Sequence, residues 1–166
     1  MSPSVPGRAA AVPGRSRPNR AIPLVAAVLL LGACAGPPVS NTPAPATGVF
    51  EQMAANGIAT DSLTAGDGGC NDPGQAPFAI HALIRYPASS KSTADVYLFT
   101  YADHGAWQRQ AGAFEACRET FVATGAHGRP VVELDISPYR AFGPAWSAGL
   151  RAALEQSLTE AAGNGG

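Results

Sequence analysis

Residues 78–101, FAIHALIRYPASSKSTADVYLFTY, contain two strands and the turn between them, and the other predicted elements surround this pair. Apolar side chains recur at every second position in residues 78–86, and residues 95–101 alternate in the same way. Residues 87–93 begin with proline and are otherwise small or polar, which is typical of a turn. The stretch therefore predicts an antiparallel hairpin.

Three helices are predicted around the hairpin. Trp107, Phe114 and the apolar residues between them follow helical spacing and predict a long helix at about 106–122, capped by Asp103. A shorter helix is predicted at 49–59. Pro144 suits the first turn of a last helix, where its missing N–H costs nothing.

A third strand is predicted at residues 130–136, whereas residues 60–77 and 137–143 carry turn chemistry and are read as loops. An extra edge strand within 60–70 stays open. The order is α-β-β-α-β-α, so we expect an α+β domain with a small mixed three-stranded sheet. A right-handed crossover would place the second and third strands parallel, with helices on at least one face.

The N-terminal segment predicts export from the cytoplasm. Four arginines and no acidic residue precede the apolar run AIPLVAAVLLLGAC at residues 21–34. A positive region, a short apolar region and small residues before a cleavage point form a secretory signal. The run is shorter than the roughly 20 apolar residues that a membrane-spanning helix needs.

The end of this run, Leu31-Gly32-Ala33-Cys34, resembles the lipobox of bacterial lipoproteins. The resemblance implies removal of residues 1–33 as a lipoprotein signal peptide and attachment of diacylglyceryl and a further acyl chain, such as palmitate, at Cys34. Several acyl chains anchor a protein stably, whereas one chain is marginal. The alternative is an ordinary secretory signal in which this cysteine is incidental.

The rest of the chain divides into a tether and a single domain. Residues 34–48 hold the lipidated cysteine and four prolines, and they predict an extended tether. Residues 49–162 are predicted to form one globular α+β domain, followed by a disordered tail at 163–166.

Lipidation of Cys34 would leave Cys70 and Cys117 as an even pair outside the cytoplasm. Such a pair predicts a disulfide, with two free thiols as the alternative.

The charge balance excludes some partners. Removal of residues 1–33 leaves seven basic and twelve acidic residues, a formal charge of −5. An acidic domain without a basic stripe does not suit nucleic acid, and we expect no such partner.

Strand parity brings three aromatic side chains to one face of the predicted sheet. If helices cover the face with Ile80, Leu98 and Leu134, the opposite face carries the following candidate binding residues: His81, Arg85, Tyr97, Phe99, Tyr101, Glu133 and Asp135. Aromatic residues ringed by charges suit recognition of a partner. Alternatively, the first helix covers this face as a second core layer.

His81 is the one catalytic candidate, with Glu133 or Asp135 to orient its imidazole. The three histidines show no metal-ligand spacing, and the aspartates of residues 60–77 lack a calcium-loop pattern. We expect no metal and no cofactor, and the sequence singles out no further catalytic residue.

The segment before the last helix concentrates Tyr139, Arg140 and Phe142. Aromatic residues with arginine on a loop can form a binding hot spot. They can equally close the end of a small core.

Residues 97–117, YLFTYADHGAWQRQAGAFEAC, resemble extracytoplasmic sensor and lipoprotein domains of actinobacteria, a likeness that implies no site residue. We expect a protein anchored by lipid to the cell membrane and facing outside the cytoplasm. A non-catalytic binding or accessory module for an envelope protein, peptide or glycan is the leading hypothesis. The alternatives are a small envelope hydrolase using His81 and a purely structural lipoprotein.

Overall fold

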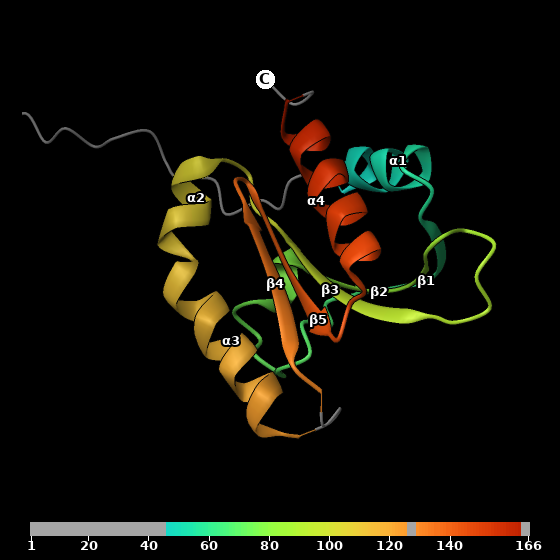
Figure 1. The fold of residues 1–166 in the computed structure, drawn as a ribbon. Coiled ribbons are helices and arrows are strands. Elements are labelled where there is room, and N and C mark those ends of the chain that lie inside the picture. The colour runs from blue at the N-terminus through green and yellow to red at the C-terminus, as the bar shows by residue number, and fades with distance from the viewer. Residues whose placement is uncertain (1–45, 126–128, 164–166) are drawn as a thin grey trace, which may run out of the picture. The chain divides into compact units, whose positions relative to one another are not determined.

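The computed structural model describes residues 46–125 and 129–163, which form a five-stranded antiparallel sheet with helices on both faces (Figure 1). The strands are β1 (Ala59–Ala65), β2 (Ala79–Arg85), β3 (Ala94–Thr100), β4 (Val131–Ile136) and β5 (Tyr139–Pro144). The helices are α1 (Thr47–Ala55), α2 (His104–Arg109), α3 (Ala111–Ala123) and α4 (Ala148–Gly163), with a short 3₁₀ turn, η1 (Ala76–Phe78). The predicted signal peptide, Cys34, residues 35–45 of the tether and residues 164–166 lie outside the described residues.

The hairpin is confirmed. β2 and β3 pair antiparallel, from Ala79 opposite Phe99 to Ile84 opposite Ala94. They form the middle of a sheet whose strand order is β1-β2-β3-β5-β4.

The predicted three-stranded mixed sheet is wrong, because two predicted loops contain strands. β1 lies in the predicted loop at 60–77, and within 60–70 it forms the edge strand that the sequence left open. Six of its seven residues are exposed, so it carries no apolar alternation. β5 lies in the predicted loop at 137–143, and its first five residues are all buried. A strand covered on both faces also lacks alternation.

The position of β5 also removes the expected parallel pair. β5 pairs antiparallel with both β3 and β4, so those two strands run in the same direction without touching. The third strand of the prediction corresponds to β4, and it runs in the same direction as β3, as expected. A two-residue turn, Ser137 and Pro138, sends the chain back between β3 and β4.

The helix boundaries differ from the prediction at three places. The helix expected at 106–122 consists of α2 and α3, which meet at Gln110, and the Asp103 carboxylate accepts from the Ala106 N–H at 2.7 Å as the expected cap. α1 begins inside the predicted tether. Pro144 ends β5 rather than opening a helix, and the Ser147 hydroxyl accepts from the Leu150 N–H at the start of α4.

The helices lie on both faces of the sheet, and each face holds a core (Figure 1). α1 and α4 pack on the face that carries Ile84, Leu98 and Leu134. α2 and α3 pack on the other face. On β5, Gly143 lies so close to the Asp95 carbonyl and the Trp146 ring that a Cβ at this position would clash with them. Among the described helices, none combines the length and hydropathy needed to cross a membrane.

Candidate functional site

The aromatic face of the sheet is a core and not an open recognition surface. Tyr97, Phe99 and Tyr101 are between 0 and 7% exposed. α3 covers them through Phe114 and Phe121, whose rings lie 5.1 Å from Phe99 and 4.9 Å from Tyr97. The sequence allowed for a covered face but assigned the cover to the first helix. That assignment is wrong, because α1 packs on the opposite face.

His81 lies beside this core with a carboxylate at each ring nitrogen. Nε2 is 2.9 Å from Oδ1 of Asp95, and Nδ1 is 3.2 Å from Oδ2 of Asp67. The imidazole stacks on the Tyr97 ring with 4.5 Å between centroids. Each ring nitrogen of His81 therefore faces a carboxylate of the domain itself rather than Glu133 or Asp135. The contacts tie the loop that follows β1 to β2 and β3.

The proposed catalytic partners of His81 lie elsewhere. In the sheet, His81 is opposite Tyr97, Tyr97 opposite Phe142, and Phe142 opposite Glu133. Three strand spacings of about 4.8 Å separate the histidine from Glu133 by about 14 Å along the sheet. Glu133 instead lies 3.2 Å from the Arg118 guanidinium. Burial, followed by the nearby Glu115, raises the pKa of Glu133.

Arg85, another residue of the predicted binding face, also has local partners. Nε of Arg85 lies 2.8 Å from both carboxylate oxygens of Asp61, and its Nη1 donates to the Ala88 carbonyl at 2.7 Å. Arg85 thus holds the β2–β3 turn against β1.

Burial affects the ionisation of Tyr97, and this gives a testable pH dependence. Burial first, then the Asp95 and Asp67 carboxylates, raise the pKa of Tyr97 from 10.0 to about 12. Between these values the unfolded chain releases the phenol proton while the folded chain keeps it, so stability falls as pH rises. The limiting slope from this group is about 1.4 kcal/mol per pH unit.

We expect the Tyr97→Phe variant to lose stability less steeply than the parent chain on the alkaline side. Urea unfolding at several pH values between about 9 and 11 measures the two slopes. Both proteins keep the other buried tyrosines, so the difference between the two slopes reports Tyr97 alone. Equal slopes would show that this hydroxyl titrates alike in both states.

The predicted loop residues Tyr139, Arg140 and Phe142 are buried on β5, so they do not form an exposed binding loop. The guanidinium carbon of Arg140 lies 4.5 Å from the Trp107 ring centroid and 5.2 Å from that of Phe114. Its Nη1 is buried without a hydrogen-bond partner among the described residues. The segment closes one end of the core, which was the alternative prediction.

Asp135 joins this cluster rather than His81. Its Oδ1 accepts from Arg140 Nε and from Trp107 Nε1, each at 2.8 Å. Nearby, Nδ1 of His104 lies 2.9 Å from the Ser137 hydroxyl, a contact that no sequence motif indicated. These bonds fasten the β4–β5 turn to the start of α2.

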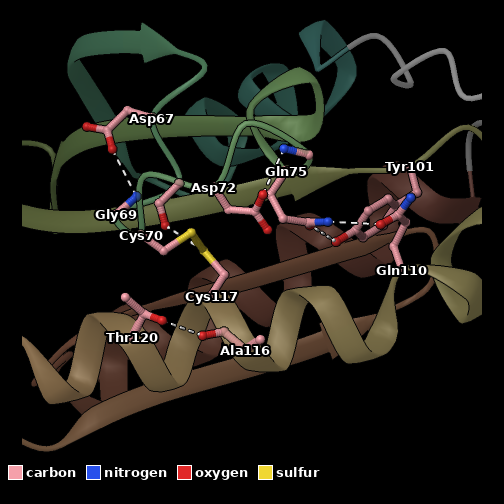
Figure 2. Close-up of a disulfide and its surroundings, with 12 residues drawn as sticks. Asp67, Gly69, Cys70, Asp72, Gln75, Tyr101, Gln110, Ala116, Cys117 and Thr120 are labelled. Carbon is pink, nitrogen blue, oxygen red and sulfur yellow. Dashed lines mark hydrogen bonds between the residues drawn. A yellow bond between two sulfur atoms is a disulfide. The ribbon is translucent and has the colours of Figure 1, made fainter.

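The glycine-rich segment 66–75 is held against α3 by the predicted disulfide, which is confirmed (Figure 2). Cys70 and Cys117 have Cα atoms 5.1 Å apart and are 47 positions apart in sequence. At the far end of the segment, Gln75 is 1% exposed; it accepts from the Tyr101 hydroxyl at 3.4 Å and donates to Gln110 at 2.8 Å (Figure 2). Burial raises the pKa of Tyr101 above its usual range.

An apolar hollow in the described surface lies on the other face of the sheet, between α1 and the β1 edge. This α1–β1 groove is open to solvent and has a volume of about 660 Å³, and its walls are mainly apolar. Its principal lining residues are Phe50, Glu51, Ala54, Leu63, Ala65 and Ile80. Leu63 is 51% exposed, which is unusual for a large apolar side chain in this domain.

The sequence did not single out the α1–β1 groove, since Leu63 fell in a predicted loop. A lone leucine inside ATDSLTA, next to an edge strand already considered possible, was the available signal. A neighbouring polar hollow shares Ala65 and is lined by Gly66, Asp67, Asn71 and Asp72.

No group of three or more histidine, cysteine, aspartate or glutamate residues within 46–125 and 129–163 is placed to hold a metal ion. Comparison with protein-family models, curated proteins and solved structures gave no match.

Proposed function

We propose that this chain is a lipid-anchored protein on the outer side of the cell membrane and that its domain is a non-catalytic binding module. The lipobox-like sequence ending at Cys34 supports the anchor. The Cys70–Cys117 disulfide agrees with this location, because disulfides persist in oxidising compartments and are rare in the cytosol.

The α1–β1 groove carries the binding part of the proposal. Ligand sites are concave and mainly apolar, with volumes of roughly 300–1,000 Å³. The groove is mainly apolar and its volume lies within this range, and it adjoins a strand whose outer edge is unpaired among the described residues. The hydrolase alternative lacks its geometry, since neither Glu133 nor Asp135 approaches His81 and both contact arginines instead.

The anchor is tested by Cys34→Ser in the full chain expressed in a bacterium. The parent chain should partition into detergent and carry the mass of its acyl chains. The Cys34→Ser variant should keep its signal segment and lack those chains, because the acceptor thiol is gone.

The matched control replaces both Cys70 and Cys117 by serine and should stay acylated. Acyl chains on the Cys34→Ser protein, or an unacylated parent, would refute the anchor while leaving the groove to be tested separately.

A further inference from the structure

Within residues 46–125 and 129–163, the edge of the sheet beside the α1–β1 groove has unpaired backbone groups. β1 is the first strand in the order β1-β2-β3-β5-β4, so only one of its sides is paired within the described residues. Just beyond β1, the Gly66 N–H donates to the Ala79 carbonyl at 2.8 Å. Because hydrogen-bonding direction alternates along an antiparallel strand, the N–H and C=O groups of Leu63 and Ala65 point to the open side.

The side chains of the same two residues point into the groove. Leu63 is opposite Ala82 and Ala65 opposite Ile80, which places all four on the α1 face of the sheet. Leu63, Ala65 and Phe50 together line the groove. A chain lying along β1 would therefore meet hydrogen-bonding groups at the edge and apolar surface beside it.

The charges near the groove discriminate between occupants. Glu51 is the one charged lining residue, and Asp67 and Asp72 line the adjoining polar hollow. Neither lining contains lysine or arginine. A fatty acid or anionic lipid would bring a negative charge to these carboxylates, whereas a basic side chain would be attracted. An acyl chain would also leave the open backbone groups of β1 unused.

We infer that the α1–β1 groove binds an extended peptide segment of a partner protein, which adds to β1 as a sixth strand. Apolar side chains at alternate positions enter the groove, and a lysine or arginine lies near Glu51 or the polar hollow. In strand addition, main-chain hydrogen bonds supply affinity and pockets for alternate side chains supply specificity. The inference deepens the proposed binding function by naming the class of partner, and it does not depend on the lipid anchor.

The full chain, purified in detergent, is first used to select binders from a phage-displayed library of random peptides. Selected peptides should share alternating apolar residues with a basic residue beside them. Their affinity is then measured by fluorescence anisotropy against the parent and two variants, Leu63→Asp and Val122→Asp. Leu63 and Val122 are 51% and 50% exposed, so either change should leave the fold intact.

We expect Leu63→Asp to weaken binding about tenfold or more and Val122→Asp, on α3, to leave it unchanged. Methylating alternate backbone nitrogens of the peptide adds a second test. Only the set whose N–H groups would face β1 should abolish binding.

The inference is overturned if no peptide is enriched, or if enriched peptides bind Leu63→Asp as tightly as the parent. It is also overturned if a fluorescent fatty acid binds with sensitivity to Leu63→Asp while peptides do not. Peptide binding is measured in detergent and does not require the lipid anchor. If the Cys34→Ser experiment refuted the anchor, the peptide-binding result would therefore still hold. A failed selection would equally leave the anchor untouched.

Discussion

Removal of the Cys70–Cys117 disulfide should lower the free energy of unfolding by about 4 kcal/mol. The bridge closes a loop across 47 positions, and the chain-entropy relation gives this value for a loop of that length. The loss arises mainly in the unfolded chain, which gains the freedom that the bridge denied it. The free energy of unfolding from urea titrations of the parent and of the Cys70→Ala, Cys117→Ala double variant measures it.

The loop that the bridge holds should show the same change locally. Residues 66–75 pack on the aromatic core beneath α3, where Gly68 lies against Phe99 and Gly69 against Phe121. Without the bridge we expect faster proteolytic cleavage in this segment. Adding reductant serves as a control, because it should destabilise the parent and leave the double variant unchanged. A difference below about 1 kcal/mol would contradict the entropic account.

Phe142→Ala should cost about 4 kcal/mol, within the range measured for phenylalanine truncation in cores. Phe142 is 0% exposed, and its ring lies between 5.1 and 5.8 Å from those of Phe99, Phe114 and Phe121. Tyr97 stacks on it at 5.3 Å. Truncation would leave a cavity at the centre of this cluster. The surrounding rings pack against one another and cannot move far enough to fill it.

The matched controls for this prediction are Phe142→Leu and Leu63→Ala. Phe142→Leu keeps most of the volume and should cost clearly less than alanine. Leu63→Ala removes an exposed side chain and should change stability by no more than about 0.5 kcal/mol. Thermal or urea unfolding gives all three values. A Phe142→Ala cost close to that of Leu63→Ala would show that the cluster is not packed as described.

Local sequence patterns predicted those helices and strands whose own residues show helical spacing or strand alternation. The β2–β3 hairpin has alternation in both strands and a polar turn between them. α3 has its buried stripe of Phe114, Cys117 and Phe121 at helical spacing. Two cysteines in a domain that the sequence predicts to be exported were sufficient to predict their bridge.

The candidate site could not be predicted in the same way. The aromatic residues of β3 were correctly placed on one face, yet a strand's alternation does not reveal which helix covers that face. The α1–β1 groove depends on residues from α1, β1 and β2 that no motif connects.

The hairpin, the apolar stripes of the helices and the cysteine pairing could be predicted from the chain alone, because each follows from periodicity or from counting. The sequence also predicts the lipid anchor at Cys34, which remains to be tested. The place of β5 between β3 and β4, and the place of β1 at the edge of the described sheet, became known from the fold. A strand buried on both faces and a strand exposed on most of its length both lack alternation. Their neighbours, rather than their own residues, make them strands.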